Sequence, residues 1–219
     1  MKFYSNQLSQ LIEKIAGGTI KSLLLYGHNR GFISAIIEQL VKKFDFFSVN
    51  LNGKEATEAN LNLLANTSNF FKQKELIKID YNGSAVNKEL MRFLTTGNFT
   101  NFICFIGDES LPSSGIRKLF EDSAHMAAIG CYYDDENMVV KLANSMALKH
   151  QKTISEEALF YIKVSLKGDY QIIKNELEKL INYTHNKGKI TYEDAQAAIS
   201  PDLSANGDEM CIFFSKKEP

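Results

Sequence analysis

The first two thirds of this 219-residue chain alternate short apolar runs with segments of helical periodicity, which limits the folds open to it. Each apolar run has the length of a buried strand, and each helical segment can cross from one strand to the next. The expected strands are residues 22–26, 44–51, 75–80, 101–106 and 127–133. The expected helices between them are residues 32–43, 55–66, 84–95 and 113–123. Because such crossovers join parallel strands, the sequence predicts an α/β fold with a parallel sheet flanked by helices.

The pattern changes near Asp134, after which we expect helices and no strand. Residues 137–150 and 169–184 have helical periodicity, Ser155 is placed to cap a helix, and Thr191 is placed to cap a short one. The sequence therefore predicts a small all-α domain that packs on the first domain, because so few residues make a weak core alone.

These patterns predict three regions. The α/β domain is expected at 1–135, the helical domain at 136–200 and a C-terminal stub at 201–219. Within the stub, the apolar run 210–214 has too little partner sequence to be buried, so we expect it to lead toward a further domain.

Composition excludes several classes of protein. Twenty-five basic residues against 26 acidic ones leave a net charge of -1, which argues against a strongly basic nucleic-acid surface over the whole chain. The scattered Cys104, Cys131 and Cys211 form no CxxC pair, which argues against a disulfide framework or a zinc site. No apolar run approaches the ~20 residues that span a bilayer, so the protein is expected in the cytoplasm and away from membranes.

A strand, a glycine-containing loop and a helix follow one another in the order of a phosphate-binding loop. The loop residues are Gly27, His28, Asn29, Arg30 and Gly31. A working loop needs a lysine and a hydroxyl residue next, but Phe32 and Ile33 stand there. The backbone amides could still attract an anion, or the two glycines simply turn the chain.

We therefore expect no catalytic residue, no metal and no cofactor. Asp80 and Asp108 end apolar strands, where an ATPase places a carboxylate, but they have no clear catalytic role without the loop lysine. The four histidines form no pair with metal-binding spacing.

Four segments resemble, in order along the chain, the delta subunit of the bacterial DNA polymerase III clamp loader. They are LLYGHNRG at 24–31, FFKQKELIKI at 70–79, SSGIRKLFE at 113–121, and GDY at 168–170 followed by NELEKL at 175–180. The resemblance implies an AAA+ fold with a helical lid and no ATP hydrolysis of its own, within a DNA polymerase holoenzyme. It also implies a C-terminal collar domain, missing from this sequence, that joins the gamma, tau and delta prime subunits.

The resemblance further implies a partner and a site. Family members open the ring-shaped sliding clamp, the beta subunit, by pushing an apolar pair into a pocket of the clamp. The matching pair is Phe70 and Phe71, where the family more often has Leu-Phe. Four polar residues at 66–69 precede the pair, which favours exposed anchors. The alternative is that one or both rings cover the edge of the sheet.

Three functions stay open. The first is a non-catalytic loader subunit that binds and opens the clamp, with DNA as a further candidate partner in the complex. The second is a divergent P-loop ATPase or kinase, which magnesium-dependent nucleotide binding would favour. The third is a nucleic-acid adaptor, whose best patch is diluted by the acidic Glu75 and Asp80. That patch is Lys72, Lys74, Lys78 and Lys88. A steep salt dependence of DNA binding would favour the adaptor.

Overall fold

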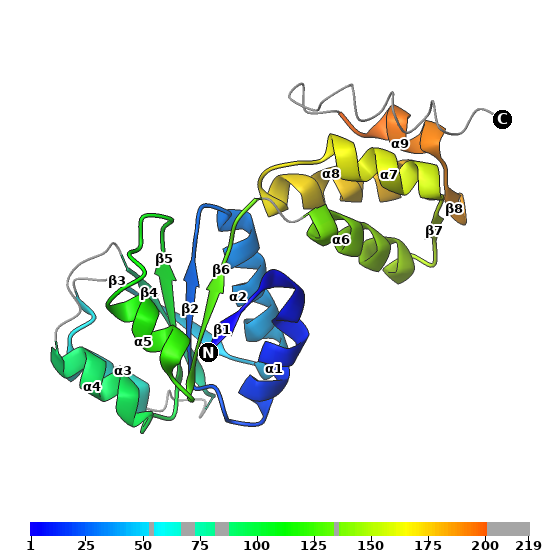
Figure 1. Cartoon of the computed structure of the whole chain (residues 1–219). Helices are drawn as coiled ribbons and strands as arrows, with labels where there is room; N and C mark the ends of the chain where they lie inside the picture. Colours follow the sequence, from blue (N-terminus) through cyan, green and yellow to red (C-terminus); the bar gives the residue numbers. More distant parts are fainter. Residues whose placement is uncertain (53–54, 67–72, 82–87, 134–135, 201–219) are drawn as a thin grey trace. The chain divides into compact units, whose positions relative to one another are not determined.

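The computed structural model describes residues 1–52, 55–66, 73–81, 88–133 and 136–200. The chain divides into two compact units, Met1–Tyr132 and Tyr133–Pro219 (Figure 1). The predicted division into 1–135, 136–200 and 201–219 stays a prediction, because 134–135 and 201–219 lie outside the described residues. No helix in the described part of the chain combines the length and the apolar character needed to cross a membrane.

The first unit is built on a six-stranded sheet in which every neighbouring pair of strands is parallel. The strands are β1 (Lys2–Phe3), β2 (Ser22–Tyr26), β3 (Phe47–Asn52), β4 (Glu75–Asp80), β5 (Phe102–Gly107) and β6 (Met126–Gly130). Their order across the sheet is β1-β6-β2-β5-β4-β3. The predicted α/β class with a parallel sheet is confirmed.

Helices cover both faces of this sheet (Figure 1). They are α1 (Leu8–Ala16), α2 (Arg30–Phe44), α3 (Glu58–Asn66), α4 (Lys88–Thr96) and α5 (Ile116–Asp122), with a short 3-10 helix at Ser5–Gln7. α3, α4 and α5 contribute to one hydrophobic core, in which Phe105 of β5 meets Phe120 of α5 edge to face at 5.7 Å between ring centres. α2 buries Ile36 and Leu40 on the other face.

Several stretches of the first unit differ from the prediction. β1 was not predicted, and the strand expected at 127–133 ends at Gly130. Phe44, predicted to begin a strand at 44–51, ends α2, because Asp45 adopts the left-handed conformation (φ 53°) that stops a helix. Phe46 is then buried and stacks on Phe102 at 5.8 Å, and β3 begins one residue later. No helix was predicted at α1, although Leu11 and Ile15 lie on its buried face at helical spacing.

In its described residues, 136–200, the second unit has four helices and a very small sheet. The helices are α6 (Glu136–Lys149), α7 (Glu156–Ser165), α8 (Tyr170–Tyr183) and α9 (Tyr192–Ala198). Two short strands, β7 (Thr153–Ile154) and β8 (Lys189–Ile190), pair in parallel. The expectation of no strand after Asp134 was wrong, because strands of two residues are too short to give an alternating pattern.

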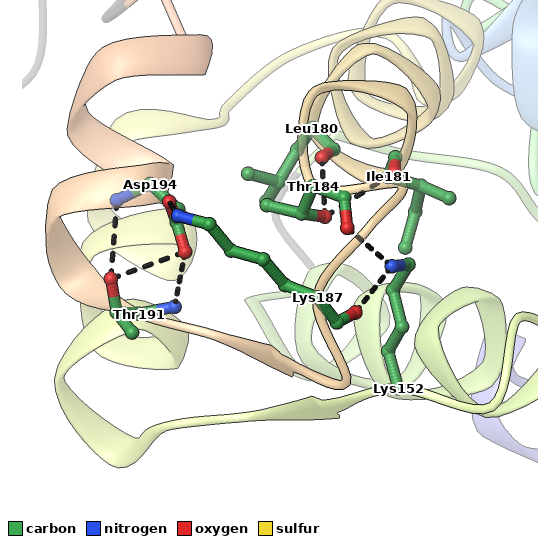
Figure 2. A network of polar contacts seen from close by, with 7 residues as sticks. All are labelled: Lys152, Leu180, Ile181, Thr184, Lys187, Thr191 and Asp194. Atoms are coloured by element: carbon green, nitrogen blue, oxygen red, sulfur yellow. Dashed lines mark hydrogen bonds and ion pairs between the residues drawn. The ribbon is translucent and has the colours of Figure 1, made fainter.

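Polar side chains fix the ends of these helices. The hydroxyl of Ser155 accepts a hydrogen bond from Ala158 N at 3.2 Å, which confirms the predicted cap of α7. Thr191 caps α9, also as predicted, in a reciprocal capping box with Asp194. Figure 2 shows that the ammonium of Lys187 reaches the same carboxylate, at 2.5 Å. Local sequence thus sets the starts of α7 and α9.

The end of α8 is held both locally and from outside the helix. The hydroxyl of Thr184 donates to Leu180 O at 2.9 Å and to Ile181 O at 3.3 Å. Lys152, which precedes β7, is buried, and its ammonium donates to the backbone carbonyls of Thr184 at 2.5 Å and Lys187 at 2.6 Å (Figure 2). A third carbonyl, that of His185, lies at 3.4 Å. A cation at a helix C-terminus satisfies carbonyls that have no partner within the helix. Lys152 therefore ties α8 to the α6–β7 connection.

Candidate functional site

The loop at 27–31 lies at the carboxyl edge of the sheet, where α/β proteins commonly bind ligands. It follows β2, the central strand between β6 and β5. β2 is buried along its whole length, and the ends of β5 and β6 lie beside it, since Tyr26 is level with Gly107 and Gly130. The predicted loop residues are therefore together at one edge.

Gly27 is held against the backbone that follows β6. Its φ of 132° is a conformation that other residues rarely adopt, and an added Cβ would lie 2.1 Å from the carbonyl oxygen of Cys131. The amide of Cys131 in turn donates to Tyr26 O at 2.7 Å. The space in front of Gly27 is thus filled by the protein's own main chain.

Asn29 is a buried residue that holds the loop in place by hydrogen bonds. Its side chain is fully buried, and Oδ1 accepts from Phe32 N at 3.0 Å, so Asn29 is the N-cap of α2. Its Nδ2 donates to Tyr132 O at 3.3 Å, and its backbone amide donates to Cys131 O at 3.1 Å. One side chain and its own amide therefore join the start of α2 to the segment after β6.

The amides that would cradle a phosphate are occupied by acceptors within the chain. Asn29 N donates to Cys131 O, Arg30 N to His28 O and Phe32 N to Asn29 Oδ1. Phe32 and Ile33, which stand where a lysine and a hydroxyl are needed, are buried in the core. A phosphate at this loop would have to displace internal hydrogen bonds and would find no lysine.

The polar side chains around the loop also have partners within the chain. His28 Nδ1 lies 2.9 Å from Glu109 Oε2, and Arg30 donates to Gly107 O at 3.4 Å. Asp108 accepts from both the amide and the hydroxyl of Ser110, at 3.1 and 2.7 Å, as a turn-forming aspartate does. Within the described part of the chain, no three His, Cys, Asp or Glu side chains are placed to share a metal ion.

Below the loop, a buried tyrosine forms a small polar cluster with α5. Tyr26 donates to Glu121 Oε1 at 3.2 Å, and Arg117 Nε donates to the same oxygen at 3.0 Å. The Arg117 guanidinium also lies 4.5 Å from the centre of the Tyr26 ring. Burial raises the pKa of Tyr26 to about 12. The cluster joins the end of β2 to α5 and leaves no ionised tyrosine at neutral pH.

The second predicted site, Phe70 and Phe71, lies outside the described residues, as does Lys72. The structure does describe the two ends of the connection that carries the pair: α3 ends at Asn66, and β4 begins at Glu75. Of the predicted basic patch, Lys74 is exposed and Lys78 is half-buried.

The contacts of Asn101 were missed, because the sequence predicts it only as the first residue of a strand at 101–106. It precedes β5 and is buried. Both ends of its amide are hydrogen-bonded, to Glu75 N and to Leu64 O. An asparagine directly before an apolar strand was a weak signal, since it indicates a turn as readily as a buried tether.

Known proteins with similar folds include a clamp-loader protein and a branch migration motor. The Bacillus subtilis DNA clamp loader delta protein matches 97% of this chain and 73% of its own, with a TM-score of 0.65 and 15% identity. The Thermotoga maritima RuvB Holliday junction branch migration motor matches 88% of this chain and 66% of its own, with a TM-score of 0.52 and 13% identity. At such low identities these likenesses show the fold alone, and they confirm the predicted AAA+ class.

Sequence comparison identifies the family. No protein-family profile matches the sequence. A Rickettsia prowazekii (strain Madrid E) protein described as a probable DNA polymerase III subunit delta is 37% identical over 218 residues. The match covers 100% of this chain and 68% of that protein. With this identity over its whole length, the chain belongs to the family of DNA polymerase III delta subunits.

Proposed function

We propose that this chain is a clamp-loader subunit that binds and opens a sliding clamp and hydrolyses no ATP itself. The observation that carries the proposal is the 37% sequence identity between this chain and a probable delta subunit over 218 residues. Its partners in this proposal are the beta clamp and the gamma, tau and delta prime subunits of the loader, with DNA in the assembled complex.

The loop geometry supports the absence of hydrolysis. The amides of Asn29, Arg30 and Phe32 already donate to acceptors in the chain, and Cys131 O blocks the approach to Gly27. Catalysis of phosphoryl transfer depends on positioning the phosphates and neutralising their charge, so a loop without a lysine supplies neither.

The test of this part is nucleotide binding to the purified chain with Mg²⁺, together with steady-state ATP turnover. We expect no magnesium-dependent binding and no turnover above that of a buffer blank. Turnover that disappears when Asp80 or Asp108 is replaced by Asn would contradict the proposal and favour the divergent ATPase.

Clamp opening requires that the subunit bind one clamp conformation better than another. If a small fraction of clamp rings has one relaxed interface, a subunit that binds this relaxed conformation more tightly shifts the equilibrium of the clamp toward it. In this proposal Phe70 and Phe71 are the apolar anchors. Burying one Phe side chain contributes about 1.5–3 kcal/mol. Since each ~1.4 kcal/mol is a factor of ten, two anchors account for about a hundredfold or more in affinity.

The double variant F70A/F71A tests the anchors directly. We expect clamp affinity, measured by surface plasmon resonance, to fall about a hundredfold while the melting temperature stays unchanged. The matched control is F47A, because Phe47 is a half-exposed phenylalanine on the edge strand β3. A large fall in the melting temperature of F70A/F71A would assign the two rings to the core. If the melting temperature and the clamp affinity are both unchanged, the clamp-binding site must lie elsewhere on the chain.

A further inference from the structure

Asn101 joins three elements at the amino edge of the sheet, the edge opposite the loop at 27–31. It precedes the first residue of β5 and is 4% exposed. Its Oδ1 accepts from the amide of Glu75, the first residue of β4, at 3.0 Å. Its Nδ2 donates to the carbonyl of Leu64, in the last turn of α3, at 2.8 Å.

Main-chain contacts reinforce this junction. The amides of Thr100 and Asn101 both donate to Ala65 O at 3.0 Å. The last carbonyls of a helix have no partner within it, so α3 is capped by the segment that leads into β5. The end of α3 and the start of β4 are therefore both fixed to one point, although they are separated along the sequence by residues 67–74.

We propose that Asn101 is a positioning residue for clamp binding: its amide holds in place the two chain ends that flank Phe70 and Phe71. This inference rests on the proposed function. A binding segment whose ends are fixed loses less conformational freedom when it docks, so fixing them raises affinity without adding a contact. The Asn101 amide offers an acceptor to Glu75 N and a donor to Leu64 O from two separate atoms at once.

The chain supplies a matched control in Asn29. It is also buried, and its amide likewise accepts from one backbone N–H, of Phe32, and donates to one backbone carbonyl, of Tyr132. Its contacts lie at the carboxyl edge. Loss of either amide removes one hydrogen bond from a backbone N–H and one to a backbone carbonyl, so N29A and N101A should lower the melting temperature comparably.

The experiment compares N101A, N101Q and N29A in the full chain. Hydrogen exchange followed by mass spectrometry reports the peptides that cover 61–66 and 75–80, and surface plasmon resonance reports affinity for the beta clamp. We expect N101A to speed exchange in both peptides and to weaken clamp binding about tenfold. N101Q, which restores the donor and the acceptor, should recover part of that affinity. N29A should lower the melting temperature but leave clamp affinity unchanged.

Three results would overturn the inference. Exchange in the two peptides could be unaffected by N101A, or faster exchange could leave clamp affinity intact. N29A could weaken clamp binding as much as N101A does, which would mean that the loss of affinity reflects general stability. If N101A does not fold, N101S carries the same comparison. The proposed function fails separately, if the unmodified chain does not bind the clamp. Clamp binding that survives F70A/F71A would overturn the inference alone, because the clamp site would then lie elsewhere.

Discussion

Replacing Lys152 by methionine should destabilise the second unit, because a buried ammonium helps to cap α8. Lys152 is 8% exposed, and its two short hydrogen bonds end on the carbonyls of Thr184 and Lys187. Methionine has a similar length and flexibility, so K152M keeps most of the packing and removes the charge and its donors.

The magnitude follows from what each carbonyl does after the change. Thr184 is 1% exposed, so its carbonyl would keep only the hydrogen bond from the amide of Lys187 at 2.8 Å, whereas the exposed Lys187 can hydrate its own carbonyl. Each lost hydrogen bond to a charged group contributes about 1.5–3 kcal/mol. Relief from burying a cation offsets part of this loss. We expect a net loss of about 2–3 kcal/mol, or about 10–20 °C in melting temperature for a domain of this size.

The assay is thermal unfolding of the full chain, followed by far-UV circular dichroism and calorimetry. The control is K189M, because Lys189 is an exposed lysine on β8. We expect K189M to melt with the wild type and K152M to show an earlier transition. A K152M melt within about 2 °C of the wild type would refute the reasoning, since the cap would then contribute almost nothing.

Three further predictions concern single residues. G27A should cost about 2–5 kcal/mol in chemical denaturation, because its Cβ would strike Cys131 O at a strained φ; G17A, whose Cβ makes an ordinary contact at 3.5 Å, should not. Burial raises the pKa of Tyr26 from 10.0 to about 12. The folded state therefore holds this proton more tightly, so stability should fall as pH rises from about 10 to 12 and Y26F should flatten that slope. Asp194 has its pKa lowered by the hydrogen bond from its lysine partner, so stability should be lost as acid titrates it, and D194N should reduce that dependence in acid denaturation.

Patterns within one segment predicted most of the fold. Residues 22–26 and 75–80 match β2 and β4 in both bounds, because continuous or alternating apolar runs bounded by polar residues leave little choice. The caps at Ser155 and Thr191 were predicted because their partners lie within three residues. The run beginning at Phe44 was misassigned at its start, since an apolar run alone does not say where a helix stops.

The candidate site was less accessible to sequence reasoning because its contacts are long-range. That Phe32 and Ile33 replace a lysine and a hydroxyl was visible in the sequence. That Cys131 O fills the approach to Gly27 was not, because about a hundred residues separate the two positions. Asn101 reaches partners 26 and 37 residues away. No local pattern distinguishes such a tether from an ordinary turn asparagine.

The internally bonded loop has a consequence for how this chain responds to the energy state of the cell. A ligand shifts a conformational equilibrium only as far as it binds one state better than the other. The amides of Asn29, Arg30 and Phe32 are bonded within the chain, so a nucleotide at this loop would gain little by binding one state over another. If the proposed function holds, the chain would act as a constitutive element, equally competent with or without nucleotide. Timing by ATP would then be imposed on it by neighbouring subunits.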